Sequence, residues 1–314
     1  RRGYAGFVSC RSCGEVMKCP HCDVSLSEHK GGRLICHYCG YTQPMPKLCP
    51  KCGSKYILGF KAGTQQIEEK LKELYPGVRT LRMDADTTRT KESYEKILSS
   101  FANGEADVLI GTQMIVKGHD FPKVTLVGIL AADLSLNASD YRAGERTFQL
   151  LTQAVGRAGR GVLPGEAVIQ TYQPDHYAIT CAAAQDYESF YQEEILYREL
   201  SGYPPVAHML AVQIYGKEEE NVKQLALRLT DVVKSNMDFL SGKQKEQSNK
   251  KIQVLGPAPA NISKINDIYR YVFYVKHAEY DVLVEVKDRL EETLRQWQPR
   301  QMSIQFDFDP VSVL

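Results

Sequence analysis

The sequence predicts an α/β protein with a cysteine-rich module near the start of the chain and a separate α+β domain at its end. Eight of the nine cysteines lie in four Cys-x-x-Cys pairs within the first 52 residues. Strand and helix patterns then alternate over 54–180, and a β-α-β-β-α-β order follows the GYPP stretch at 202–205. A chain of 314 residues is too long for one compact core, so we expect more than one domain.

The composition is that of a folded globular protein and argues against some other classes. Charged residues make up 25% and hydrophobic residues 43% of the chain, as in folded globular proteins, and no apolar run is long enough to span a membrane. The net charge of +1 gives no overall basic field that would indicate nucleic acid. The chain opens on RRGYAGFVS, with neither an initiator methionine nor a signal peptide, so we expect a piece of a longer intracellular protein.

The four cysteine pairs predict two zinc ions. Paired spacing without a signal peptide favours metal over disulfides, and two Cys-x-x-Cys turns complete one tetrahedral site. The segment DVSLSEHKGGRLI between Cys22 and Cys36 has the pattern of a hairpin, which would bring its two ends together. The predicted sites are therefore nested: zinc 1 takes Cys10, Cys13, Cys49 and Cys52, and zinc 2 takes Cys19, Cys22, Cys36 and Cys39.

Other interpretations of the cysteines stay open at this point. A sequential arrangement would pair 10/13 with 19/22, although only five residues separate these two pairs. Four redox-active dithiols are a further interpretation. Because eight cysteines already supply enough ligands, we expect His21, His29 and His37 to be ordinary polar surface residues.

The central segment has the pattern of a parallel sheet. We expect strands at 56–64, 78–86, 106–113, 124–133 and 167–172, and helices at 65–77, at 88–103 and around the stretch QLLTQAVGRAGRG at 149–161. Asp86 or Thr87 is expected to cap the second of these helices. Such alternation predicts a mostly parallel sheet covered by helices on both faces.

One edge of this sheet is the expected ligand site, because ligands bind beyond the carboxyl ends of parallel strands. Gly63-Thr64 and GTQMIVKGHDFP at 111–122 fall there, as does the stretch at 149–161. In that stretch Gln153, Arg157 and Arg160 have the spacing i, i+4, i+7, which on a helix puts them on one face. The glycines between them would let a polyphosphate approach. We expect the two arginines to be exposed and to share a crevice with Thr112, Lys117, Gly118, His119 and Asp120.

These motifs resemble those of a known family. TQMIVKGHDFP resembles motif V of superfamily 2 helicases, and QAVGRAGR resembles their motif VI. The cysteine array between RRGYA and GT, together with RMDADTTR, IQTY, GYPP and GPAPA, is similar to the PriA family of bacterial replication-restart helicases. The resemblance implies that 1–9 and 54–180 form the second RecA-like helicase lobe, with the zinc module 10–53 inserted into it. A connecting helix at 181–203 and a DNA-binding α+β domain at 204–314 would follow.

The resemblance also implies residue roles. Arg157 and Arg160 would contact the phosphates of ATP, with Arg160 as the arginine finger, and Gln153 would order the site. Gly118 and Asp120 would line the nucleotide and couple it to DNA, while Thr112 would touch the DNA backbone. The implied activity is ATP-dependent 3′→5′ DNA unwinding at stalled forks, followed by primosome assembly. Forked and single-stranded DNA, primosome proteins and single-strand-binding proteins would be its partners, in the nucleoid-associated bacterial cytoplasm and away from membranes.

Two motifs of an ATPase are missing from these 314 residues. The sequence contains no G-x-x-x-x-G-K-[ST] and no DExH box, which cradle phosphates and hold Mg²⁺ in such enzymes. We therefore expect this chain alone not to hydrolyse ATP, and ATP and Mg²⁺ to belong to the full-length protein. The alternative is a non-enzymatic zinc-containing module that binds DNA or protein, and a third interpretation is a cysteine-based redox chaperone.

The last part of the chain has a split α+β pattern. After a helix at 176–200 we expect strands at 209–216, 252–260, 267–276 and 302–309, helices over 222–232 and 279–297, and a polar linker at 241–251. This order is the ferredoxin-like arrangement. Lys264 and Arg270 lie among tyrosines, a mixture typical of single-strand binders, so both are candidate DNA contacts.

Overall fold

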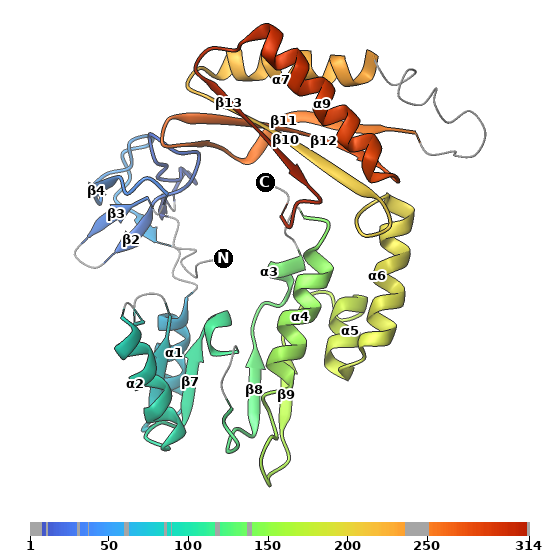
Figure 1. Cartoon of the computed structure of the whole chain (residues 1–314). Helices are drawn as coiled ribbons and strands as arrows, with labels where there is room; N and C mark the ends of the chain where they lie inside the picture. The colour runs from blue at the N-terminus through green and yellow to red at the C-terminus, as the bar shows by residue number, and fades with distance from the viewer. Residues whose placement is uncertain are drawn as a thin grey trace.

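The computed structural model describes residues 8–312, apart from 11, 30–31, 37, 60–62, 85–86, 89, 117–119, 137–139 and 236–250. Figure 1 shows the cysteine-rich module in blue, the α/β elements from light blue to yellow-green, and the C-terminal sheet with its helices from yellow to red. The cysteine-rich module lies beside one end of the C-terminal sheet (Figure 1).

The cysteine-rich module begins and ends at one place. Strand β1 (Val8–Cys10) pairs antiparallel with β5 (Ile57–Gly59), so the entry and exit of the module lie side by side. Between them β2 (Ser27–His29), β3 (Arg33–Ile35) and β4 (Thr42–Pro44) form an antiparallel sheet. The β2–β3 hairpin is the one that the sequence predicts, whereas β4 was not predicted.

The central segment is α/β with parallel strand pairs, as predicted. Its elements are α1 (Thr64–Leu74), β6 (Thr80–Met83), α2 (Lys91–Ala102), β7 (Val108–Gly111), β8 (Leu126–Ile129), α3 (Asp133–Leu136), α4 (Ala143–Val155) and β9 (Glu166–Ile169). Strand β6 pairs parallel with β7, and β8 pairs parallel with β9. Within the described residues these are two separate pairs rather than the one continuous sheet that the alternation suggests (Figure 1).

The start of α2 differs from the prediction. The N-cap is Thr90, whose hydroxyl accepts a hydrogen bond from the Ser93 backbone N–H, while the Ser93 side chain reaches back to Thr90. This reciprocal capping box satisfies two donors at once. Thr87 instead closes a turn on Asp84, whose side chain accepts its N–H at 3.1 Å. Asp86 lies outside the described residues.

The single helix expected at 176–200 is two helices, α5 (Tyr177–Ala184) and α6 (Tyr187–Ser201). Gln185 adopts a left-handed conformation with φ 55° and ends α5. Asp186 then caps α6 by accepting the Ser189 N–H at 3.0 Å. Local capping chemistry therefore divides a segment whose composition favours helix throughout.

The C-terminal domain has the predicted ferredoxin-like order. It comprises β10 (His208–Gly216), α7 (Glu219–Ser235), β11 (Gln253–Ile265), β12 (Ile268–His277), α9 (Tyr280–Trp297) and β13 (Met302–Phe308). The antiparallel sheet has the order β11-β12-β10-β13, and both helices cover one of its faces (Figure 1). Residues 241–250 of the predicted linker lie outside the described residues.

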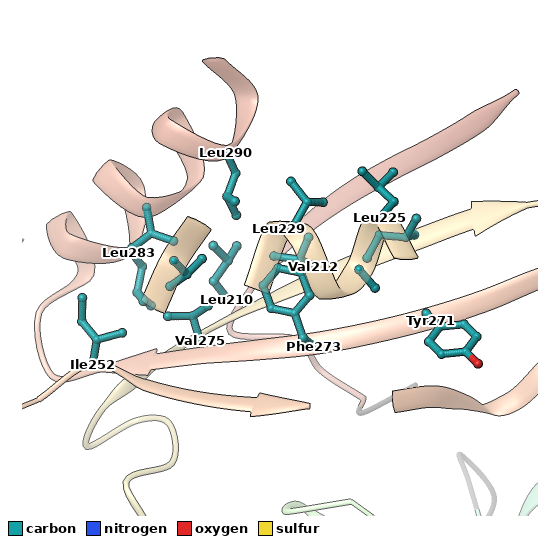
Figure 2. Close-up of a cluster of buried hydrophobic side chains, with 14 of the residues drawn as sticks. Leu210, Val212, Leu225, Leu229, Ile252, Tyr271, Phe273, Val275, Leu283 and Leu290 are labelled. Carbon is teal, nitrogen blue, oxygen red and sulfur yellow. The ribbon is translucent and has the colours of Figure 1, made fainter. Parts of the chain in front are cut away.

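The core of this domain lies between the sheet and its two helices. The alternate strand residues Leu210, Val212 and Phe273 are fully buried and face Leu229 of α7 and Leu283 of α9 (Figure 2). Alternate residues of β10 and β12 belong to this cluster, and the cluster residues of α7 and α9 recur at helical spacing. In the described part of the chain, no helix is both long enough and apolar enough to cross a lipid bilayer.

Candidate functional site

The structure gathers the eight paired cysteines into two groups of four. One group is Cys10, Cys13, Cys49 and Cys52, the other is Cys19, Cys22, Cys36 and Cys39, and in each group the sulfurs lie within 4.8 Å of one another. This is the nested grouping and not the sequential one. It follows from the β2–β3 hairpin, which joins the inner pairs, and from the β1–β5 pair, which brings the outer pairs together.

The spacing of the sulfurs fits a tetrahedral zinc ion. Tetrahedral Zn–S bonds of about 2.3 Å place neighbouring sulfurs about 3.8 Å apart. The Cys10–Cys52 and Cys13–Cys49 sulfurs are 3.6 Å and 3.7 Å apart, and the Cys19–Cys39 sulfurs are 3.6 Å apart. Four thiolates are a donor set that zinc prefers in structural sites.

Three of the four Cys-x-x-Cys turns share one backbone device. The residue after each second cysteine is a glycine with positive φ: Gly14 at 76°, Gly40 at 77° and Gly53 at 70°. Its N–H closes the turn by donating to the first cysteine's carbonyl, at 2.9 Å, 3.0 Å and 2.9 Å. Glycine suits this position because a Cβ disfavours the left-handed region. The fourth turn, Cys19 to Cys22, is followed by Asp23 and lacks this glycine.

The thiols differ in their readiness to lose a proton. Burial acts to raise the pKa of Cys10, but the backbone N–H groups of Cys13 and Ser12 outweigh it and lower the pKa to about 6. Burial raises the pKa of Cys22 to about 12, although the backbone N–H of Asn266 acts to lower it.

The arginine stretch is a turn and not a helix face. Helix α4 ends at Val155, with Gly156 as its C-cap, so only Gln153 lies on the helix, where it is exposed. Arg157 and Arg160 lie in the turn that follows, so the predicted common helical face is wrong. Arg160 is exposed as predicted, whereas Arg157 is half-buried. The reason is local, because Gly156 and Gly159 are poor helix formers and Gly159 adopts φ 71°.

Two predicted site residues meet at this turn. Arg160 Nη1 lies 3.3 Å from Asp120 Oδ1, and Arg160 Nε donates to the Gly156 carbonyl at 2.6 Å. The Arg160 side chain is 42% exposed, so its guanidinium faces solvent while it is held. Thr112 is the N-cap residue of the short 3₁₀ turn Gln113–Ile115 after β7, and its side chain makes no capping hydrogen bond. Lys117, Gly118 and His119 lie outside the described residues.

The glycines in and just after the stretch 149–161 lie where other backbone segments of the protein come very close. A Cβ on Gly161 would lie 2.1 Å from the Pro122 carbonyl oxygen, and a Cβ on Gly165 would lie 2.1 Å from the Gly159 nitrogen. Gly159 N–H donates to the Val124 carbonyl at 3.0 Å. The glycines therefore let the segment that follows α4 pack closely against the end of motif V and the residues after it.

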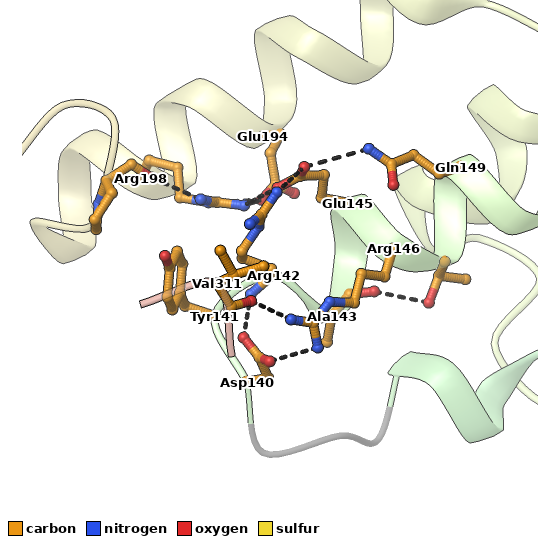
Figure 3. A network of polar contacts seen from close by, with 12 residues as sticks. Asp140, Tyr141, Arg142, Ala143, Glu145, Arg146, Gln149, Glu194, Arg198 and Val311 are labelled. Atoms are coloured by element: carbon orange, nitrogen blue, oxygen red, sulfur yellow. Dashed lines mark hydrogen bonds and ion pairs between the residues drawn. The ribbon is translucent and has the colours of Figure 1, made fainter. Parts of the chain in front are cut away.

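The other end of α4 is tied to α6 by buried charges that the sequence analysis did not identify. Arg198 of α6 is 4% exposed and donates to Glu194, to Glu145 at 3.2 Å and to the Pro204 carbonyl at 2.6 Å (Figure 3). Glu145 also accepts two hydrogen bonds from Arg142, at 2.6 Å and 2.9 Å. These contacts lower the pKa of Glu145, the largest effect coming from Arg142. The only local signal was the i, i+4 spacing of Glu194 and Arg198.

The same end of α4 also contacts the last described residues. The Tyr141 hydroxyl donates a hydrogen bond to the Pro310 carbonyl at 3.0 Å. Arg146 donates to the Val311 carbonyl (Figure 3). Arg146 is fixed in turn by Asp140 at 2.6 Å. Helix α4 therefore joins the arginine turn to the C-terminal segment.

The candidate DNA contacts lie on the C-terminal sheet. Lys264 Nζ donates to the Pro20 carbonyl at 3.0 Å, with its side chain only 21% exposed, so it joins the sheet to the cysteine-rich module. Arg270 is half-buried, donates to the Ile262 carbonyl at 3.4 Å and lies over the Tyr215 ring at 5.8 Å. Their DNA-binding roles stay predictions.

Comparisons with known families match three segments of the chain. Residues 19–44 match the PriA DNA helicase Cys-rich region (CRR) domain, and residues 48–162 match the helicase conserved C-terminal domain. Residues 199–311 match the primosomal protein N C-terminal domain.

Curated relatives match over nearly the whole chain. The chain is 43% identical over 316 residues to the replication restart protein PriA of Bacillus subtilis, covering all of this chain and 38% of that protein. It is 40% identical over 318 residues to that of Synechocystis, covering all of this chain and 36% of that protein. With that of Chlamydia muridarum it is 42% identical over 279 residues, covering 88% of this chain and 36% of that protein. The chain thus spans less than two fifths of the length of these relatives. From these matches, the chain belongs to the PriA family of replication restart proteins.

Proposed function

We propose that the chain is the C-terminal part of an ATP-dependent 3′→5′ DNA helicase that recognises stalled replication forks and starts primosome assembly. The observation that supports this most directly is the contact between Arg160 and Asp120, 3.3 Å apart. It brings together motifs V and VI, which are 40 residues apart in sequence. An arginine held this way, with its guanidinium accessible, suits a phosphate group presented from a facing surface.

Under this proposal the arginine turn is one wall of a nucleotide site. Arg157 and Arg160 contact the phosphates of ATP, and Arg160 stabilises the charge that develops on the transferred phosphoryl group. Gln153 orders this wall from the last turn of α4. Gly118 and Asp120 line the nucleotide, and Asp120 holds the Arg160 guanidinium until a phosphate competes for it.

The cysteine groups are proposed to hold two zinc ions. Zinc 1 takes the outer group and zinc 2 the inner group, each with four thiolates. When bound, the ions cross-link turns that share little other structure, because the strands of this module are only three residues long. We propose a structural role that presents the module to DNA or to a protein partner.

The proposed partners are forked and single-stranded DNA, primosome proteins and single-strand-binding proteins, in the nucleoid-associated cytoplasm. Thr112 would contact the DNA backbone from the end of β7, and Lys264 and Arg270 would contact DNA from the C-terminal sheet. The Arg270 guanidinium beside the Tyr215 ring suits stacking of a base. ATP and Mg²⁺ are proposed cofactors of the full-length protein.

A comparison of two proteins tests the proposal. The full-length protein and the present 314-residue chain are assayed for ATP hydrolysis with forked DNA, with single-stranded DNA and without DNA. We expect DNA-stimulated turnover in the full-length protein and none in the 314-residue chain, which has no P-loop motif and no acidic box. A full-length protein that binds forks without hydrolysing ATP would favour the non-enzymatic alternative.

A further inference from the structure

The fourth Cys-x-x-Cys turn is completed by another domain. In the other three turns a glycine N–H donates back to the first cysteine. Asp23 stands at the corresponding place, and its N–H donates instead to the Lys264 carbonyl at 2.9 Å. The acceptor belongs to the C-terminal domain, 241 residues further along the chain. The turn is thus closed from outside the cysteine-rich module.

The closing carbonyl lies at the end of β11, in the segment 263–267 that includes the two-residue loop between β11 and β12. Asn266 and Asp267 both have positive φ, 50° and 60°, and Ile265 pairs with Ile268 across them. This is the conformation of a tight hairpin loop in which two successive N–H groups are free to point outward. Asp267 N–H donates to the His21 carbonyl at 2.9 Å, and Asn266 N–H donates to Cys22 Sγ at 3.2 Å.

Side chains reinforce this contact from both sides. Lys264 Nζ donates to the Pro20 carbonyl at 3.0 Å, and His21 Nδ1 lies 2.7 Å from the Asp267 carboxylate. The Ser263 hydroxyl donates to the Asp23 carboxylate at 2.9 Å. Ile265 packs against the buried cluster of the cysteine-rich module. The loop therefore contacts every residue from Pro20 to Asp23.

We propose that the loop at 263–267 supplies the outer coordination shell of the inner cysteine site, so that zinc at this site and docking of the C-terminal domain stabilise each other. This inference rests on the proposed zinc binding. An N–H that donates to a metal-bound thiolate offsets part of its negative charge and fixes its direction. A zinc ion in turn fixes the Cys19–Cys22 turn, which presents its carbonyl groups to the loop. The outer site receives none of the loop contacts found among the described residues, so it is an internal control.

Zinc release into excess chelator tests the proposal with each site isolated. Cys10→Ser with Cys49→Ser leaves the inner site, and Cys19→Ser with Cys36→Ser leaves the outer site. In each background Lys264→Ala with Asp267→Ala removes the side-chain docking contacts. We expect release from the inner site to accelerate about tenfold or more and release from the outer site to change less than twofold.

Two further variants sharpen the result. Arg289→Ala with Glu292→Ala removes an exposed ion pair on α9 and is expected to leave both release rates unchanged. Asp23→Gly gives the fourth turn the glycine of the other three, and in the Lys264→Ala, Asp267→Ala background it is expected to slow inner-site release again. Equal acceleration at both sites, or none at the inner site, would overturn the proposal.

Amide hydrogen exchange tests the reverse direction. Because coupling between two events is reciprocal, loss of the inner zinc should weaken the docking of the loop. Exchange at 263–267 is expected to quicken in the Cys19→Ser, Cys36→Ser chain and to stay unchanged in the Cys10→Ser, Cys49→Ser chain. Equal exchange in the two chains would contradict the coupling. A chain that holds no zinc in either background would instead contradict the proposed metal sites themselves.

Discussion

Arg160 and Asp120 join the segments that resemble helicase motifs VI and V, with Nη1 and Oδ1 3.3 Å apart. The guanidinium is at the same time fixed by the Gly156 carbonyl at 2.6 Å. Its direction is therefore set by the protein before any ligand arrives. Pre-set donors cost little reorganisation when charge develops on a phosphate.

Replacing Arg160 by alanine in the full-length protein is expected to lower DNA-stimulated ATP hydrolysis about a thousandfold, because an arginine finger contributes on that scale. Arg160→Lys is expected to recover little of it, since an ammonium lacks the planar fork. The steady-state turnover number is the measurement. Arg79→Ala is the matched control, because Arg79 is exposed and pairs with Asp107 on the β7 side of the lobe. An unchanged rate for Arg160→Ala would rule out the finger assignment.

The grouping of the cysteines predicts how zinc content responds to paired substitutions. Cys13→Ser with Cys52→Ser removes two ligands from one outer site, so about one zinc per chain should remain. A sequential grouping would place these two cysteines in different sites, and both ions would be lost. Elemental analysis of the purified chain distinguishes the outcomes. Cys181→Ser lies outside both groups and should leave about two zincs per chain.

Adding a methyl group at Gly161 is expected to destabilise the lobe. The new Cβ would lie 2.1 Å from the Pro122 carbonyl oxygen, which is backbone and has to shift. Overpacking of this kind costs about 1–3 kcal/mol, measured as a lower midpoint of urea unfolding. Gly128→Ala provides the comparison, since nothing lies within 4 Å of a Cβ placed there. Equal stability of the two variants would show that the Gly161 contact is not close in solution.

Removing the buried guanidinium of Arg198 is expected to be more costly. Arg198 is only 4% exposed, so Arg198→Ala leaves a buried cavity and removes the cation that Glu194 and Glu145 share. Breaking a buried ion pair in this way costs about 3–5 kcal/mol of unfolding free energy. Arg289→Ala, which breaks an exposed pair, should cost less than about 1 kcal/mol. Similar values for the two would mean that the Arg198 contacts are solvated.

Much of the architecture was predictable because its causes are local. The Gly-Gly turn and its flanking apolar residues predict the β2–β3 hairpin, which in turn determines which cysteine pairs meet. The order of strand and helix patterns after GYPP predicts the ferredoxin-like arrangement, and the apolar residues that recur at every second position of β10 and β12 and at helical spacing in α7 and α9 form its core.

Errors arose where a pattern fits two structures or where the cause is remote. The spacing of Gln153, Arg157 and Arg160 fits a helix, yet Gly156 and Gly159 end that helix early, and two glycines within four residues were the available signal. The contact of Lys264 with Pro20 has no local signal, because it joins segments 244 residues apart in sequence. Arg198 was missed for a similar reason, since its acceptor Glu145 lies 53 residues away in sequence.

Helix α4 has 13 residues and is therefore about 20 Å long. At one end it carries the arginine turn, and at the other Tyr141 and Arg146 bind the carbonyl groups of Pro310 and Val311. A helix of this length resists compression along its axis far better than a loop does. Under the proposed function, binding and release of a phosphate by the arginines would therefore shift α4 along its axis and move the C-terminal segment that it contacts.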